Sequence, residues 1–380
     1  KSLMVRTILR SRFTRVLCFL VFAMILNSLL GYCVPIASAN QIVLTKIAQI
    51  ETGDAYDVWV DTSRNITYVT CGYSGVKAFD VSDPGNPIEI ATVSSSLDYY
   101  AHQLVMRNNL MFIGDGRGGL KIIDFGNISS PIVLSQYTGD YAWDVEVRGD
   151  TAFVANGFQG VGDRLTIVNV SDPTSPELLG SHTIAGDATD IEIVENLAFV
   201  TTSYAGFTVF DVSNHTNPIQ LTQYVGPSTS DADLGDLEII GELAFLSYWG
   251  KSFKILNISN LSNIEIIAEY NETLDSFSVH IDTDRNLAFL CDLELGLLLL
   301  DIQNPTQITE VTRYFDGGKP NRIDVVGNLI YMTDQENGFV ILEIGESGGP
   351  SIGLEPLLII GGLAAIVVIY CLLKKVRTPS

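Results

Sequence analysis

The sequence predicts an all-β fold, a seven-bladed β-propeller, and three observations predict it. A strand-and-turn unit returns seven times between residues 55 and 344. Each unit divides into four strand-like runs separated by short Gly, Asn and Asp turns. No run in this region has the period of a helix. Four strands per unit, at a repeat of this length, are typical of propeller blades.

The first 39 residues are predicted to be a signal peptide. Five basic residues between Lys1 and Arg15 precede an apolar stretch, 16–34, and Ala37-Ser38-Ala39 forms a small-residue cleavage site. Cleavage there would make Asn40 the first residue of the mature chain. The apolar stretch is long for a signal peptide, so an uncleaved membrane anchor is the alternative. In both cases the residues that follow are expected to be exported.

Residues 41–50, QIVLTKIAQI, read as a β-strand that precedes the first repeat unit. This strand is similar to the last run of other units, such as PIVLSQY and PIQLTQY. The seventh unit lacks such a run, because it stops after its third strand at Glu343. We therefore expect residues 41–50 to pair with the last blade and to close the ring, since closure removes the unpaired sheet edges.

The third run of each unit, with the turn that follows it, is the most regular part of the repeat. It reads VKAFDVSDP at 76–84, LTIVNVSDP at 165–173 and LLLLDIQNP at 297–305. These stretches resemble the LVIVD repeat family. The resemblance implies β-propeller blades of an exported protein and offers no catalytic motif. The polar residue that ends the run recurs at intervals of 42 to 46, as Asp80, Asp124, Asn169, Asp211, Asn257, Asp301 and Glu343.

The charge of the chain argues against nucleic acid as a partner. The two ends, 1–39 and 357–380, hold eight of the 22 basic residues and none of the 44 acidic residues. Residues 40–356 therefore carry 14 basic and 44 acidic side chains, a net charge of −30. Such a surface repels phosphate backbones, and it suits cations, basic partners or simple solubility.

The C-terminal region is predicted to anchor the protein in the cell membrane. Residues 345–356 read as a linker and 357–373 as a transmembrane helix of 17 residues, about 26 Å long. The basic residues of 374–380 then form a cytoplasmic tail. The propeller, 40–344, would lie outside the cell. Sequons predict a glycoprotein, although Asn in place of the turn Asp also creates them, and they begin at Asn65, Asn127, Asn169, Asn214, Asn257, Asn260 and Asn271.

One face of the propeller is expected to bind a ligand. This top face carries the loops that lead into the first strands and those that join second to third strands, and the short linker would hold the opposite face near the membrane. Aromatic rings beside acidic and amide groups suit a sugar or a protein partner, although packing between blades is their alternative role. The candidate ligand-binding residues are Tyr56, Asp57, Trp143, Tyr204, Tyr248 and Trp249.

Three consecutive units begin their first strand with the spacing Asp-x-Glu. Alternate residues of a strand share a face, so the six carboxylates are expected to line one side of the channel mouth. Their mutual repulsion predicts a bound cation such as Ca²⁺, raised pKa values, or backbone N–H partners. A capping role at the start of the strand is the alternative for the three aspartates. The candidate metal ligands are Asp144, Glu146, Asp190, Glu192, Asp236 and Glu238.

These patterns together predict a cell-surface binding or adhesion module for an extracellular protein or glycan. No cofactor is certain, and Ca²⁺ is the candidate. Two alternatives stay open at this point. One is a metal-dependent extracellular hydrolase or lyase that uses Glu146, Glu192, Glu238 and His280 at the channel mouth. The other is a structural component of a surface layer.

Overall fold

The computed structural model describes residues 41–94, 100–158, 161–203, 206–225, 234–249 and 252–347. Residues 42–345 form one compact unit. A second unit, 1–41 with 346–380, lies outside the described residues apart from Gln41, Glu346 and Ser347. The predicted signal peptide, transmembrane helix and cytoplasmic tail fall there. Within the described ranges, the chain has no helix with the length and apolar character needed to cross a membrane.

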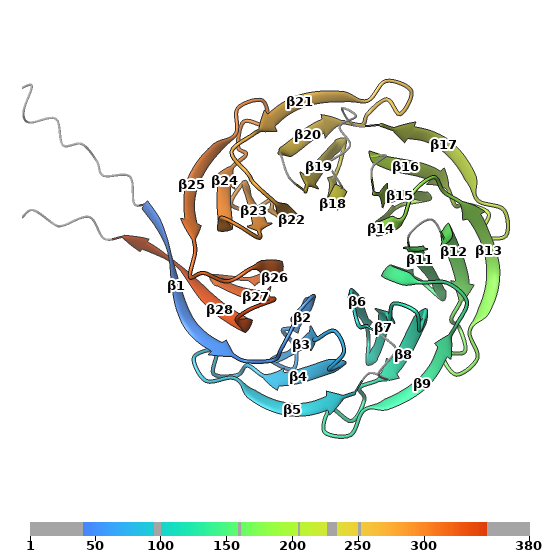
Figure 1. The fold of residues 1–380 in the computed structure, drawn as a ribbon, viewed down its shortest axis with the longest axis horizontal. Coiled ribbons are helices and arrows are strands. Elements are labelled where there is room, and N and C mark those ends of the chain that lie inside the picture. The colour runs from blue at the N-terminus through green and yellow to red at the C-terminus, as the bar shows by residue number, and fades with distance from the viewer. Residues whose placement is uncertain are drawn as a thin grey trace, which may run out of the picture. The chain divides into compact units, whose positions relative to one another are not determined.

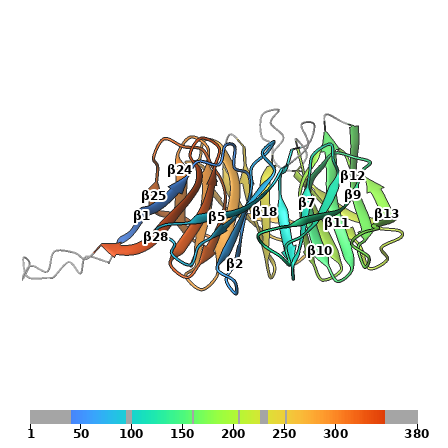
Figure 2. The same ribbon diagram turned by 90° about the horizontal axis from the view of Figure 1, so that it is seen from below.

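The described residues form 28 β-strands in seven four-stranded sheets and contain no helix. Figure 1 shows the sheets arranged around a centre as blades, and Figure 2 shows the same ring from the side. In blades 1 to 6 the chain runs from the innermost strand to the outermost, and each strand pairs antiparallel with the next. The predicted seven-bladed, all-β propeller is confirmed.

The strands fall into four sets by their place in the blade. The innermost strands are β2 (Val58–Asp61), β6 (Leu104–Arg107), β10 (Ala142–Arg148), β14 (Ala188–Val194), β18 (Leu234–Ile240), β22 (Ser276–Asp282) and β26 (Pro320–Val326). The second strands are β3 (Ile66–Thr70), β7 (Leu110–Gly114), β11 (Thr151–Phe158), β15 (Leu197–Thr202), β19 (Leu243–Tyr248), β23 (Leu287–Asp292) and β27 (Leu329–Asp334). The third strands are β4 (Val76–Asp80), β8 (Leu120–Asp124), β12 (Val161–Asn169), β16 (Gly206–Asp211), β20 (Phe253–Asn257), β24 (Gly296–Asp301) and β28 (Gly338–Ser347). The outermost strands are β5 (Ile88–Val93), β9 (Ile132–Tyr137), β13 (Glu177–Thr183), β17 (Ile219–Tyr224), β21 (Glu265–Tyr270), β25 (Thr309–Tyr314) and β1 (Gln41–Ile50).

Strand β1 completes the seventh blade, whose strand order is β1-β28-β27-β26. Figure 1 shows β1 along the outer side of β28. Gly338 gives separate evidence, because it has a φ of +78° and any side chain there would collide with the Ile50 carbonyl. Gly296 of blade 6 has the same relation to the carbonyl of Tyr314, the last residue of its outermost strand. Ile50 thus takes the place of an ordinary outer-strand residue, and the pairing predicted for residues 41–50 is confirmed.

The hydrophobic core lies between the blades. The described residues form seven clusters of buried apolar side chains, and each cluster combines two neighbouring blades. The middle strands pack on both faces, so they do not alternate between apolar and polar residues; β3, for example, is buried along its whole length. This two-sided packing explains why the second and third runs of each repeat are almost continuously apolar.

In blades 1 to 6 the polar residue that ends the third strand closes the turn at the bottom face. Asp80 Oδ1 accepts the backbone N–H of Ser82 at 2.8 Å, and Asn169 Oδ1 accepts that of Ser171 at 3.0 Å. Because the side-chain oxygen alone makes this bond, Asn replaces Asp without changing the turn. The turn therefore accounts for the Asn at 169 without glycosylation, which stays a prediction.

Candidate functional site

A cavity of about 690 Å³ lies at the mouth of the central channel, on the face predicted to bind. Residues of all seven blades line it, from the starts of the innermost strands and the loops between second and third strands. Its aromatic residues are Tyr56, Tyr73, Tyr100, Tyr141, Trp143, Phe158, Trp249 and Phe277. Its polar residues are His102, Gln103, Arg117, Asp187, Thr189, Ser203, Arg322 and Gln335. The loops of the top face therefore converge on one hollow.

Rings from blades 1 to 3 form one continuous wall of this cavity, and we call it the aromatic wall. The ring centroids are 4.5 Å apart for Tyr73 and Tyr100, 4.9 Å for Tyr100 and His102, 4.2 Å for His102 and Trp143, 5.2 Å for Trp143 and Tyr141, and 4.7 Å for Tyr141 and Phe158. These separations are typical of aromatic pairs that stabilise one another. On another side of the cavity, Trp249 and Phe277 form a second ring pair, 5.5 Å apart.

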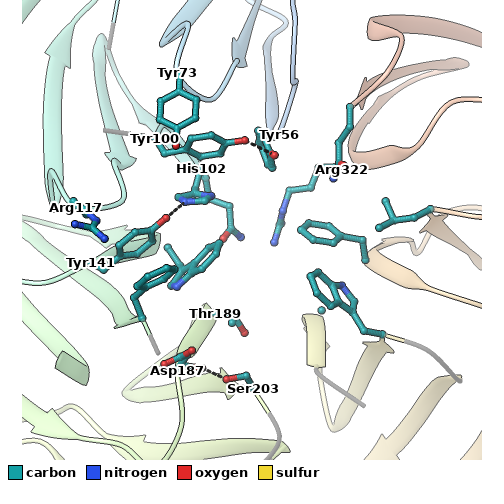
Figure 3. A pocket seen from close by; sticks show the side chains of 18 residues that line it. Tyr56, Tyr73, Tyr100, His102, Arg117, Tyr141, Asp187, Thr189, Ser203 and Arg322 are labelled. Atoms are coloured by element: carbon teal, nitrogen blue, oxygen red, sulfur yellow. Dashed lines mark hydrogen bonds between the residues drawn. The ribbon is translucent and has the colours of Figure 1, made fainter. Parts of the chain in front are cut away.

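Hydrogen bonds at the ring edges hold the aromatic wall in place. Trp143 Nε1 donates to the Gly157 carbonyl at 2.5 Å, and His102 Nε2 lies 2.9 Å from the Tyr141 hydroxyl. The Tyr100 hydroxyl donates to that of Tyr56, and Figure 3 shows these side chains beside one another. Burial lowers the pKa of His102 to about 3, so the imidazole is neutral at physiological pH. Trp143 Nε1 and His102 Nε2 are thus already bonded, and His102 itself is buried among the other rings.

The wall of the channel itself carries the Asp-x-Glu pairs. A second cavity, of about 350 Å³, is lined by all six of the predicted metal ligands together with Asp57, His280 and Asp324. The three aspartates of the pairs are buried. The structure therefore brings the six carboxylates to one surface, as the alternation of side chains along a strand required.

Most of these carboxylates connect one blade to the next through backbone N–H groups. Asp144 and Asp236 each accept an N–H from the innermost strand of the following blade, and Glu192 and Glu238 do the same two residues further along. The bonds join Asp144 to Ile191 (2.9 Å), Asp236 to Val279 (3.0 Å), Glu192 to Ile239 (2.6 Å), Glu238 to Ile281 (2.8 Å) and Asp57 to Leu104 (2.8 Å). Two of the glutamates thus bind backbone N–H groups of the innermost strand of the next blade, as Asp144 and Asp236 do. Glu146 instead pairs with Arg148 at 3.0 Å.

Arg322 supplies a positive charge to the channel from blade 7. Its Nη2 lies 3.1 Å from Asp190 Oδ1 and 3.1 Å from Asp236 Oδ1, so one guanidinium links blade 7 to blades 4 and 5. Burial lowers the pKa of Arg322, but the carboxylates of Asp236, Asp190, Asp57 and Asp144 together raise it more, and the net shift is upward. In the sequence, Arg322 occupies the position that holds Asp144, Asp190 or Asp236 in other blades. This replacement of an acidic residue by a basic one was the feature of the sequence that indicated a counter-charge for the channel carboxylates.

The carboxylates of the channel have raised pKa values. Burial raises the pKa of Asp144 and Asp236 to about 7, of Glu238 to about 8 and of Glu192 to about 9. In the part of the chain that the structure describes, no three His, Cys, Asp or Glu side chains are grouped so as to hold a metal ion. A Ca²⁺ site at these residues stays a prediction. The partners that the structure provides are backbone N–H groups and Arg322.

We expect the propeller to lose stability as the pH rises from about 5 to about 9. The pKa values of Glu238 and Glu192, about 8 and about 9, lie above their ordinary value of 4.5, so the folded state binds these protons more tightly than the unfolded chain. The resulting stabilisation is complete below the ordinary pKa and is lost as the pH passes through the raised values. Thermal unfolding should show the melting temperature falling by about 5 °C or more across this range.

A double substitution provides the control for this pH dependence. Glu192→Gln with Glu238→Gln keeps an acceptor oxygen for each backbone N–H and removes both titrations. The melting temperature of that variant should vary less between pH 7 and pH 9, where the two glutamates titrate, and should keep the fall between pH 5 and pH 7 that the raised pKa values of Asp144 and Asp236 cause. A parent protein whose stability is flat or rises over this range would show that the two glutamates are ionised in the folded state.

The structure separates the residues that were expected to bind a ligand. Tyr56, Trp143 and Trp249 line the cavity, whereas Asp57 lies on the channel wall. Tyr248 is 4% exposed and packs in the cluster between blades 4 and 5, so it is corrected to a core residue. Adjacent residues of an extended chain point to opposite faces. Trp249, which directly follows β19, is the one that lines the cavity. Tyr204 lies outside the described residues.

Sequence reasoning missed several lining residues that one alignment of the blades would have found. Trp143 directly precedes the aspartate of its Asp-x-Glu pair. The residues that directly precede the matching position in the other blades are Tyr56, His102, Thr189, Gly235, Phe277 and Asn321, and all of these except Asn321 line the cavity. Phe277 and His102 were therefore accessible from the repeat. Tyr73 and Arg117 occupy equivalent positions, after Gly72 and Gly116 in the loops before β4 and β8, but the residue type differs between the two blades.

The ring of seven sheets and the cavity at its axis define the class of this protein: a repeat-built β-propeller, which is a general binding scaffold. The chain belongs to the LVIVD repeat family. The sequence profile of the LVIVD repeat matches it seven times, at residues 52–95, 100–139, 139–183, 185–225, 232–272, 285–316 and 317–352. These matches confirm the resemblance seen in the third run of each unit.

Solved structures share the fold. A crystal structure of the computationally designed Ika8 protein matches with a TM-score of 0.57 and 9% sequence identity, over 79% of this chain and 100% of that chain. At this identity the likeness shows the fold alone. A comparison with curated proteins gave no match.

Proposed function

We propose that this protein is a cell-surface binding module whose top-face cavity holds its ligand. The observation that carries the proposal is the set of eight aromatic rings which, among the described residues, converge from five blades on one cavity of about 690 Å³. That volume lies within the usual range of ligand sites, and a few placed polar groups among aromatic side chains are their usual lining. Four of the rings, Tyr56, Tyr100, Tyr141 and Trp143, are also held by hydrogen bonds before any ligand arrives, which lowers the entropic cost of binding.

The direction of the last strand supports a cavity that faces away from a membrane. Gln335 lines the cavity just before β28 begins, and β28 then runs toward the opposite face of the ring. A membrane anchor after β28, as the apolar run at 357–373 predicts, would leave the cavity on the outer side. The basic and apolar leader at 1–34 supports export of the propeller.

The hydrogen bonds of the channel favour binding over catalysis. A hydrolase or lyase would need carboxylates that are free to take up a metal or to exchange protons with a substrate. Glu192 and Glu238, two of the candidates for that role, accept backbone N–H groups of the next blade at 2.6 and 2.8 Å. Their use as blade connectors favours the aromatic cavity as the ligand site among the described residues.

Removal of one ring from the cavity is expected to weaken binding. The full chain would be screened on an array of glycans and extracellular proteins, and each hit measured again with Trp143→Ala and Trp249→Ala. We expect a loss of about 10-fold or more for each, because buried aromatic anchors dominate binding energy. Phe315→Ala is the matched control, since Phe315 is 56% exposed and is not part of the cavity lining. Hits that both tryptophan variants bind as the parent does would contradict the proposal.

A further inference from the structure

The cavity presents flat apolar faces on two sides. Trp143 and His102 belong to the aromatic wall, and Trp249 pairs with Phe277 elsewhere on the lining. The polar edge of Trp143 is already bonded to the Gly157 carbonyl, so its face is the part open to the cavity. A ligand that fits such surfaces has apolar faces of its own, as the C–H faces of a sugar ring are.

Hydrogen-bonding groups of both kinds lie between the ring faces. Gln103 donates through Nε2 to Asp190 at 2.9 Å, which leaves its Oε1 as an acceptor. The Tyr56 hydroxyl accepts from Tyr100, and its own proton has no acceptor among the described hydrogen bonds. Thr189 and Ser203 add hydroxyl groups to the same lining. Donors and acceptors in mixture match ligand hydroxyls, because each hydroxyl both donates and accepts.

The charges at the cavity favour neither an anion nor a cation. Arg322 is offset by Asp190 and Asp236, each 3.1 Å away. Arg117 lies over the ring of Phe158, 6.0 Å from its centroid. An anionic ligand would approach a propeller region of net charge −30 and would meet the Asp187 carboxylate in the lining, whereas a cationic ligand would meet Arg117. A ligand without charge avoids both costs.

The same charges disfavour insertion of a protein segment. A protein partner complementary to a surface of net charge −30 would be basic. Its lysine or arginine side chains would enter a cavity whose lining includes Arg117, together with Arg322, whose charge Asp190 and Asp236 offset. The long-range and the local electrostatics therefore oppose each other for a basic protein, whereas they are indifferent to a neutral molecule.

We infer that the ligand of this cavity is an uncharged saccharide, whose sugar rings pack on the aromatic wall and whose hydroxyls bond to the polar groups between the rings. This inference rests on the proposed function and specifies its ligand class. Charge adds nothing to the recognition, so affinity comes from ring packing and from hydroxyl contacts. Salt should therefore have little influence on binding.

Matched saccharide pairs test this ligand class on the full chain. Galacto-oligosaccharides would be compared with oligogalacturonates, which add a carboxylate, and N-acetylated chito-oligosaccharides with their deacetylated, cationic forms; gluco- and manno-oligosaccharides complete the neutral set. Tryptophan fluorescence is a suitable readout, because Trp143 and Trp249 are two of the three tryptophans in the chain and both line the cavity. Each titration would be run at low and at high salt, with a peptide library screened in parallel.

We expect at least one neutral saccharide to bind more tightly than its charged counterpart, with an affinity that changes less than about twofold between the two salt concentrations. Trp143→Ala should weaken that binding by about 10-fold or more, and Phe315→Ala should not. Preference for a charged member, or binding by no neutral saccharide, overturns the inference. Peptide binding that Trp143→Ala abolishes overturns the ligand class while leaving the proposed function intact. Binding that neither tryptophan variant affects overturns the proposed function itself.

Discussion

Deletion of residues 41–50 is expected to prevent the propeller from reaching a stable, monomeric state. These residues form β1, the outermost strand of blade 7, and its loss would expose the edge of β28 along its length. Five apolar side chains of β1 pack against two of the clusters between blades: Ile42, Leu44, Ile47, Ala48 and Ile50. Even partial burial of these side chains contributes several kcal/mol, at about 1.5–3 kcal/mol for a fully buried one, against a typical total stability of about 5–15 kcal/mol.

Gel filtration and thermal unfolding would measure the effect of this deletion. Aggregation or loss of the cooperative transition is the expected result, and addition of the peptide QIVLTKIAQI should restore part of the folded protein. Two point variants distinguish the loss of apolar packing from the effect of placing an Asn anywhere in the strand. Ile47→Asn places an amide in the cluster shared with blade 1, whereas Val43→Asn changes a side chain that is 40% exposed, and only the first should destabilise strongly. A deletion variant that melts like the parent would refute ring closure by β1.

The fold was predictable because each blade has the same recognisable pattern of residues in the sequence. The polar residue of the bottom turn recurs in the first six units, since its side-chain oxygen bonds the backbone two residues on, as Asp80 does to Ser82. The middle strands are apolar throughout, because both faces pack on neighbouring blades. The role of residues 41–50 followed from the number of strand-like runs, because the seventh unit has three and the other units have four. The close approach of Gly338 to the Ile50 carbonyl shows this pairing in the structure.

The site was predictable only in part, because its residues meet through the ring and not along the chain. The sequence placed Trp143, Trp249 and Tyr56 on the correct face, since strand order determines which loops share a face. It did not distinguish Tyr248 from Trp249, because which of two adjacent residues faces the cavity depends on where β19 ends. It also left the use of the carboxylates open. Their backbone partners belong to the next blade, more than 40 residues away, as for Asp144 and Ile191.

The channel wall shows how an acidic cluster can serve the fold through backbone N–H partners. Each connecting carboxylate replaces one hydrogen bond that the innermost strand, being an edge strand, cannot make within its own sheet. Asp144 and Glu192 are examples, with bonds of 2.9 and 2.6 Å to the N–H groups of the next blade. Burial disfavours the ionised form of both carboxylates, and their pKa values are raised for this reason. A fixed positive charge near the aspartates favours their ionised form and so lowers the free-energy cost of burying them.

Replacement of Arg322, which supplies that charge, is expected to be strongly destabilising. Its side chain is 19% exposed and its two partners are 6% exposed, so Arg322→Met would leave Asp190 and Asp236 buried without a counter-charge. Breaking such a pair from one side typically costs about 3–5 kcal/mol. The loss should be smaller at pH 5 than at pH 8, because Arg322 lowers the pKa values of Asp144 and Asp236 and its removal lets both protonate more readily.

Urea unfolding at the two pH values would measure this cost and its origin. Combining Arg322→Met with Asp190→Asn and Asp236→Asn should recover most of the stability, because the triple variant also removes the two carboxylates that pair directly with Arg322. Arg313→Met is the matched control, since Arg313 pairs with Glu310 at 2.5 Å on the surface, where its side chain is 39% exposed, and the loss there should be below about 1 kcal/mol. Equal losses for Arg322→Met and Arg313→Met, or no recovery in the triple variant, would show that Arg322 contributes packing rather than charge. The propeller would then hold its buried aspartates in the protonated form.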